Sequence, residues 1–185
     1  RGDLVIALLQ QPFLFLRHGE TDANVADRIS GATDDLLNAR GRAQAAAAAR
    51  LLAGRRIAAI WHSPLTRAAD TARAVAGATG APLIPLPGLA ERNWGIWEGQ
   101  PRSALIREAT PEGGEGPEEF AARIRAALAA ITGPFPVLIV GHSGTAREIH
   151  AFLSTAPFIR PANAAPIEWR HDGCHWNSTE LSPGR

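Results

Sequence analysis

The chain of 185 residues contains no Lys, no Tyr and no Met, and its single cysteine is Cys174. One thiol cannot form an internal disulfide, a pattern typical of proteins from a reducing compartment, so we expect a cytoplasmic location. We interpret Cys174 as a filler near the C-terminus and not as a nucleophile. Because Met is absent even from position 1, we expect the printed chain to lack its natural first residue.

An excess of one charge and long apolar runs are also lacking. The chain has nineteen Arg and eighteen acidic residues, so its net charge is +1. This balance argues against a nucleic-acid or membrane-surface partner that is bound by overall charge. No apolar run approaches the ~18 residues of a membrane-spanning helix. The run "LVIALL" (4–9) follows an acid and lacks a small-residue cleavage pattern, so we interpret it as a leader into the first strand and not as a signal peptide.

The chain is 45% apolar, which is enough for a sizeable core, and we expect one domain over 1–185. Apolar runs predict strands at 12–16, 57–63, 82–87 and 135–144, with a closing hairpin at 165–170 and 175–181. Helical patterns lie between them at 39–54, 65–80, 117–131 and 145–154. This alternation predicts an α/β fold of three layers, α/β/α, whose mixed sheet is mostly parallel and covered on both faces. The irregular stretch 88–118 is long for a connection, and we expect a short lid at about 92–118.

Polar clusters follow four of the predicted strands. They are "RHGE" (17–20), "HSPLTR" (62–67), "AERNWG" (90–95) and "GHSG" (141–144). In mostly parallel sheets, ligands bind outside the carboxyl ends of the strands. We therefore expect five side chains at one rim: Arg17, His18, Arg67, Glu91 and His142.

That set of side chains suits phosphoryl transfer through a covalent intermediate. Two guanidinium groups offer planar forks of donors that match phosphate oxygens. Two imidazoles offer a nucleophile and a further donor, and one carboxylate offers a general acid or base. Because the arginines can supply the charge stabilisation that Mg²⁺ supplies elsewhere, we expect no metal and no cofactor. His171, Cys174 and His175 fit no standard zinc spacing and are interpreted as hairpin surface.

The chain resembles the histidine phosphatase superfamily, also called the phosphoglycerate mutase-like family. The matching pieces, in the family's order, are "LRHGETDAN" (16–24), "SPLTRAADTA" (63–72), "LAERNWGIWEG" (89–99), "GGEGPEEFAARI" (113–124) and "VLIVGHSGTAREI" (137–149). "NAAPIEW" and "HWNSTEL" look like the family's last strands, so the resemblance covers nearly the whole chain. The combination of these motifs is highly specific, although each one alone is not.

The resemblance implies a role for each residue of the set. His18 is the nucleophile and forms a phosphohistidine, Arg17 and Arg67 clamp the phosphoryl oxygens, and His142 donates to the same oxygens. Glu91 protonates the leaving oxygen and then helps water attack. Neighbouring arginines should keep His18 neutral, as an attacking nitrogen requires.

Two further residues are expected to bind phosphate. Asn24 matches a family position that hydrogen-bonds phosphate, and Ser143 directly follows His142. The helix expected after Gly144 adds amide groups that favour an anion. Gly19 should let the backbone pass close to the phosphate. Glu20 is interpreted as a residue that orients the loop.

Two other enzyme classes stay open at this point. "GHSGT" (141–145) resembles the G-x-S-x-G elbow of serine esterases, but Thr145 replaces the last Gly and "RHGET" would be left unexplained. A mutase is the closer alternative, and a non-catalytic phosphate-binding relative is a third. We favour a phosphatase because Glu91 and His142 lie close in sequence, and because the Tyr-Gly usual after the acid of mutases is missing. Within the family, the sequence most resembles the broad-specificity and α-ribazole phosphatases.

The expected substrate is a small-molecule phosphomonoester. Arg92, Arg102 and Arg107 in the lid could bind a second anionic group, but we favour a solvated face for them. Trp94 and Trp97 either stack on substrate or pack the lid. A homodimer is common in the family, and the sequence leaves the oligomeric state open.

Overall fold

The computed structural model describes residues 6–182 of the chain, and within them a single six-stranded sheet forms the central layer. Its strand order is β3-β2-β4-β1-β5-β6. The strands are β1 (Phe13–Arg17), β2 (Ala59–His62), β3 (Leu83–Pro85), β4 (Val137–Gly141), β5 (Pro166–His171) and β6 (Trp176–Glu180). The first four pair in parallel, and β5 and β6 add an antiparallel edge. The mixed, mostly parallel sheet is therefore confirmed.

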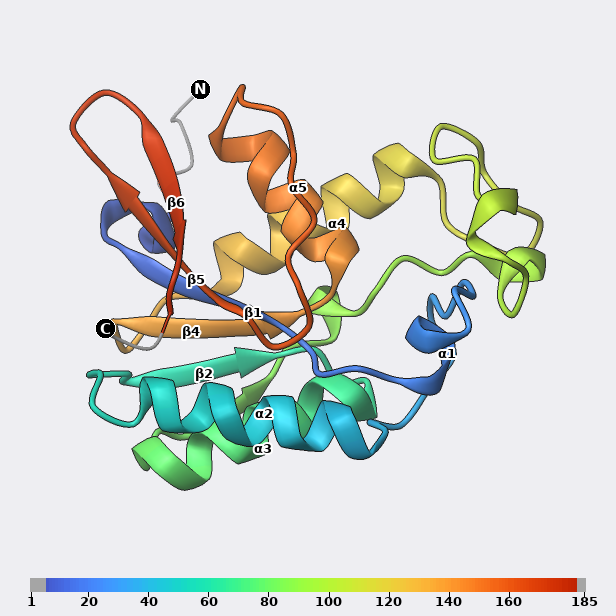
Figure 1. Cartoon of the computed structure of the whole chain (residues 1–185). Helices are drawn as coiled ribbons and strands as arrows, with labels where there is room; N and C mark the ends of the chain where they lie inside the picture. The colour runs from blue at the N-terminus through green and yellow to red at the C-terminus, as the bar shows by residue number, and fades with distance from the viewer. Residues whose placement is uncertain (1–5, 183–185) are drawn as a thin grey trace.

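Helices cover both faces of this sheet, as expected (Figure 1). The α-helices of the described residues are α1 (Asp22–Val25), which lies beyond the end of the sheet, α2 (Ala39–Leu52), α3 (Thr66–Thr79), α4 (Pro117–Ala130) and α5 (Ser143–Leu153). Helices α2 and α3 lie on one face, and α4 and α5 lie on the other (Figure 1). No helix among the described residues is both long and apolar enough to cross a bilayer.

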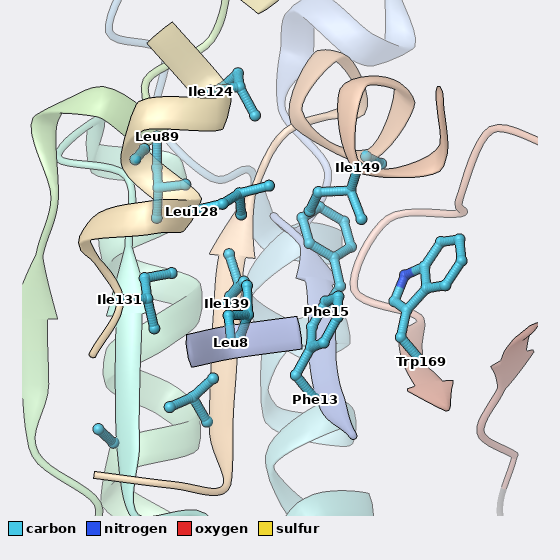
Figure 2. Packing of buried hydrophobic residues seen from close by; sticks show 14 of the residues in the cluster. Leu8, Phe13, Phe15, Leu89, Ile124, Leu128, Ile131, Ile139, Ile149 and Trp169 are labelled. Carbon is cyan, nitrogen blue, oxygen red and sulfur yellow. The ribbon is translucent and has the colours of Figure 1, made fainter. Parts of the chain in front are cut away.

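Strand β1 is buried on both faces, which explains its unbroken apolar sequence. Phe13 and Phe15 point into the core beneath α4 and α5, where they meet residues such as Ile149 (Figure 2). Leu14 and Leu16 point into the core beneath α2 and α3. Each of these four side chains is at most 6% exposed, and full burial of such a side chain stabilises the fold by roughly 1.5–3 kcal/mol.

Local signals place several helix ends where the sequence predicts them. The side chain of Asn38 accepts a hydrogen bond from the amide of Gly41 (2.8 Å) and so caps the start of α2. Gly80 ends α3 in the left-handed conformation (φ 72°), which glycine adopts without strain. Pro117 begins α4, where its missing amide hydrogen costs no helical bond.

Three local expectations need correction. The helix expected from 145 begins at Ser143, so the amide groups of its first turn lie nearer to His142 than expected. The short helix α1 and a 3-10 turn at Ala7–Gln10 were not expected. Of the proposed leader 4–9, positions 4 and 5 lie outside the described residues, whereas Leu8 is fully buried in the core and is part of the fold.

Candidate active site

A cavity of about 370 Å³ lies at the carboxyl ends of the parallel strands. Six of the seven predicted site residues line it: Arg17, His18, Asn24, Arg67, Glu91 and Ser143. The seventh, His142, is fully buried, and its ring centre lies 5.3 Å from that of His18. The structure thus brings together all seven residues that the sequence selects.

His18 is held as a neutral imidazole with one defined tautomer. Its Nδ1 lies 2.7 Å from the carbonyl oxygen of Gly19, and a carbonyl only accepts, so Nδ1 carries the hydrogen. The pKa of His18 lies well below its usual 6.5, because the ring is buried and because Arg67 and Arg17 lie nearby. Nε2 therefore keeps a free lone pair at neutral pH, which a nucleophile needs.

Backbone carbonyls anchor both arginines of the proposed clamp. Arg17 donates through Nη1 to the carbonyl of Pro161 (2.9 Å), and within residues 6–182 its buried Nε has no partner. Arg67 donates to the carbonyls of Thr33 and Gly31, each at 2.7 Å. Each guanidinium has five N–H groups, so both keep donors for a phosphoryl group in fixed positions.

His142 contacts a residue whose role the sequence did not reveal, Ser63. The hydroxyl of Ser63 lies 2.7 Å from Nε2 of His142, and both residues are fully buried. Burial, followed by the charge of Arg67 and the ring of His18, lowers the pKa of His142 well below 6.5. The neutral ring carries one hydrogen, and Ser63, whose hydroxyl can donate or accept, takes part in deciding which ring nitrogen holds it. Ser63 belongs to the "SPLTR" motif, which was the available signal.

Two backbone amides hold the carboxylate of Glu91 in place. Its Oε1 accepts from the amide of Arg92 (2.9 Å) and its Oε2 accepts from the amide of Gly144 (3.0 Å), at the start of α5. A Cβ atom on Gly144 would overlap Oε1 of Glu91 and would lie 3.1 Å from the ring of Phe120. The place of the carboxylate thus depends on a glycine that the sequence analysis did not single out.

Asn24 lines the cavity, and Asn163, a residue whose role the sequence did not reveal, holds it from behind. The Oδ1 atom of Asn24 accepts from the amide of Thr21 (3.2 Å) and from Nδ2 of Asn163 (3.1 Å), which leaves the side-chain NH₂ of Asn24 as the donor. Asn163 also donates to the carbonyl of His18 (3.0 Å). Asn163 opens "NAAPIEW", and the sequence alone indicated only the start of a strand there.

The loop after His18 is locked onto helix α2, and this gives Gly19 a different role from the expected approach to phosphate. A Cβ on Gly19 would overlap the carbonyl of Gly41, and one on Gly41 would overlap the backbone of Glu20. The amide of Gly19 donates to Thr71 (3.0 Å). The carboxylate of Glu20 accepts from Asn38 (3.1 Å), so Glu20 orients the loop as expected.

The expectation of a solvated face for the lid arginines is wrong, because Arg92, Arg102 and Arg107 all line the cavity. Arg92 is 4% exposed and holds segment 92–118 together by donating to three backbone carbonyls at 2.7–2.9 Å. Its guanidinium lies 4.0 Å from the ring centre of Trp94, which stacks on Trp97 at 6.1 Å. Trp94 is only 7% exposed and packs within segment 92–118, and it also lines the cavity.

The C-terminal histidines lie away from this cavity. Asp172 accepts hydrogen bonds from the amides of Cys174 and His175 and closes the β5–β6 turn. Over residues 6–182, no group of three or more His, Cys, Asp or Glu side chains is arranged to hold a metal ion.

Comparison with known proteins gives a consistent result. Residues 13–185 match a family model described as histidine phosphatase superfamily, branch 1. Glucosyl-3-phosphoglycerate phosphatase of Mycobacterium tuberculosis is 31% identical over 190 residues, covering 88% of this chain and 85% of that protein. Adenosylcobalamin/alpha-ribazole phosphatase of Salmonella typhimurium is 33% identical over 189 residues, covering 91% and 90%. The solved structure of the mycobacterial glucosyl-3-phosphoglycerate phosphatase in complex with VO₃ superimposes with a TM-score of 0.80 at 28% identity, covering 92% of this chain and 98% of that one. The chain therefore belongs to the histidine phosphatase superfamily.

Proposed function

We propose that the protein hydrolyses a small phosphomonoester through a phosphohistidine formed on Nε2 of His18. The observation that carries this proposal is the neutral His18, whose tautomer is fixed by Gly19 and which lies beside two anchored guanidinium groups. This arrangement supplies a nucleophile and charge stabilisation at the same place.

In the first step, the lone pair of Nε2 attacks phosphorus, and the bond between phosphorus and the ester oxygen breaks. Glu91, in its protonated form, transfers a proton to the departing oxygen, and an alcohol leaves. Arg17, Arg67 and His142 hold the three phosphoryl oxygens and stabilise their charge in the transition state.

In the second step, water attacks the phosphorus of the phosphohistidine. The carboxylate of Glu91 takes a proton from this water, and the bond between phosphorus and Nε2 breaks. Inorganic phosphate leaves, and both His18 and Glu91 return to their starting states. Because arginines take the place that a metal ion holds in other phosphoryl-transfer enzymes, we propose that the reaction is metal-independent.

Hydrolysis is favoured over mutase activity by the relatives. Those from Mycobacterium tuberculosis and Salmonella typhimurium are both named as phosphatases, of glucosyl-3-phosphoglycerate and of alpha-ribazole phosphate. We propose that this chain likewise acts on a phosphorylated small metabolite in the cytoplasm, with residues 92–118 as a lid over the substrate.

The test is phosphate release from an aryl phosphate in the presence of EDTA. Wild type should be active, His18→Ala should be inactive, and His175→Ala, which removes an exposed histidine outside the cavity, should match wild type. Labelled phosphate should remain on the denatured wild-type protein in an acid-labile form. Activity in His18→Ala, or activity that disappears in EDTA and returns with Mg²⁺, would overturn the mechanism.

A further inference from the structure

The cavity carries more positive charge than one phosphoryl group requires. Eight arginines line it: Arg17, Arg28, Arg67, Arg92, Arg102, Arg107, Arg147 and Arg160. Only three acids do so: Glu91, Glu108 and Glu148. The cavity therefore has a formal excess of five positive charges, whereas the whole chain has a net charge of +1. A phosphomonoester brings about −1.5 to −2 near neutral pH, so most of this excess is left unbalanced.

Over residues 6–182, the side chains of three of these arginines make no polar contact with the protein. Among the described residues, Arg107, Arg147 and Arg160 form no ion pair, and their side chains donate no hydrogen bond to protein. Arg102 differs from them, because its Nε lies 3.4 Å from a carboxylate oxygen of Asp27.

The three arginines reach the cavity from three separate segments. Arg107 belongs to the lid, Arg147 lies on α5, and Arg160 lies in the loop before β5. The guanidinium of Arg147 lies 4.2 Å from the ring centre of Phe158, which restricts its position. A long side chain that is already restricted loses less entropy when it binds a ligand.

These cations lie within one another's field and within that of the phosphate clamp. Partial desolvation of the guanidinium and the charge of Arg147 lower the pKa of Arg107, and partial desolvation of the guanidinium and the charge of Arg102 lower the pKa of Arg160, although Arg160 as a whole is exposed. Burial, followed by the charge of Arg160, lowers the pKa of Arg17 to about 9. An anion bound among these side chains would relieve their repulsion.

We propose that Arg107, Arg147 and Arg160 form a second anion subsite, so that the preferred substrate is a phosphomonoester with a second anionic group, either a carboxylate or another phosphate. This inference rests on the proposed phosphatase function, since the subsite holds the far end of the same substrate. Guanidinium forks bind both kinds of anion in the same bidentate way. A cavity of about 370 Å³ has room for a small metabolite with both groups.

The experiment compares three esters that share a three-carbon chain. Propyl phosphate has no second charge, 3-phosphooxypropionate adds a carboxylate, and propane-1,3-diyl bisphosphate adds a phosphate. Wild-type kcat/KM should be about tenfold to a hundredfold higher for one or both of the last two, as expected for one or two charge-assisted hydrogen bonds. The larger of the two gains identifies the second group.

Single variants locate the effect. Arg107→Gln, Arg147→Gln and Arg160→Gln should each lower kcat/KM for the preferred ester about tenfold more than they lower it for propyl phosphate. Arg50→Gln removes the same charge from an exposed site on α2 outside the cavity and should change neither value. Arg160 is exposed, so its variant keeps the test decisive if Arg147→Gln fails to fold. Equal rates for the three esters in wild type, or equal losses for all of them in the variants, would overturn the subsite.

A binding measurement distinguishes failure of the second anion subsite from failure of the proposed phosphatase activity. Calorimetry with His18→Ala measures the affinity for each ester without turnover. Tighter binding of a two-anion ester supports the subsite even if wild type hydrolyses none of the three, a result that would overturn only the catalytic proposal. Hydrolysis of propyl phosphate at the same rate as the others would keep the phosphatase and overturn the subsite.

Discussion

The contact between Gly144 and Glu91 makes a quantitative prediction. In Gly144→Ala, the new methyl carbon would lie 2.9 Å from the carboxyl carbon of Glu91 and would overlap Oε1. The same methyl carbon would lie 3.1 Å from the ring of Phe120, so it cannot shift toward that ring to avoid Glu91. The carboxylate of Glu91 must therefore move away from the amides of Arg92 and Gly144, although no side chain of the proposed mechanism has been removed.

The size of the effect follows from the proposed role of Glu91. Positioned general acid catalysis contributes about 10²–10⁴-fold to rate. A poor leaving group needs that proton in the transition state, so hydrolysis of an alkyl phosphate by Gly144→Ala should fall at least ~100-fold. An aryl phosphate with an acidic leaving group needs it less, and its first step should lose at most about tenfold.

The assay is single-turnover formation of the phosphoenzyme from the two esters. Gly77→Ala is the matched control, because Gly77 lies inside α3 and nothing lies within 4 Å of a Cβ added there. The control should keep full activity and gain roughly 0.5–1 kcal/mol in stability. Equal losses for both esters in Gly144→Ala would show that displacement of Glu91 is not the cause, and full activity with both would show that the position of Glu91 does not matter.

Three other perturbations test the site. Ser63→Ala should lower kcat about tenfold by freeing the tautomer of His142, with little change in KM; an unchanged kcat would remove Ser63 from the mechanism. Arg67→Lys should lose most activity, because an ammonium group cannot hold two backbone carbonyls and a phosphoryl group in one plane, and near-normal rates would remove Arg67 from the clamp. His18 and His142 stay neutral in the fold at pH values where they gain a proton in the unfolded chain, so stability should fall as pH drops below about 6.5, by up to about 1.4 kcal/mol per pH unit for each ring. Urea unfolding of wild type and His18→Ala between pH 7 and 5 measures this, and identical slopes would refute the contribution of His18.

Much of the fold could be predicted because its signals are local. The apolar run of β1 requires burial on both faces, and the side-chain cap of Asn38 and the left-handed Gly80 act within a few residues of the helix ends that they define. The four-residue helix α1 is too short to show a period, and it was missed for that reason.

The site was less predictable where it depends on distant contacts. Ser63 meets His142 across 79 positions, and Asn163 meets His18 across 145 positions. The direction of the Arg107 side chain is set by the path of the irregular segment 92–118, and such a segment shows no sequence period from which its cavity-facing residues could be predicted. Motifs therefore indicated which residues meet at the cavity, but not which residues hold them in place or how many arginines surround them.

The place of β1 in the sheet has a consequence for synthesis on the ribosome. This strand, which ends directly before the proposed nucleophile His18, pairs with β4 and β5, and Arg17 is anchored by Pro161. At about 5–20 residues per second, these partners emerge roughly 7–30 s after β1 does. Until then the sequence "FLFL" (13–16) has no neighbouring strand, and it is a candidate for protection by chaperones. A nascent chain that stops before Pro161 should contain the nucleophile, the arginine clamp and the acid, and still be inactive.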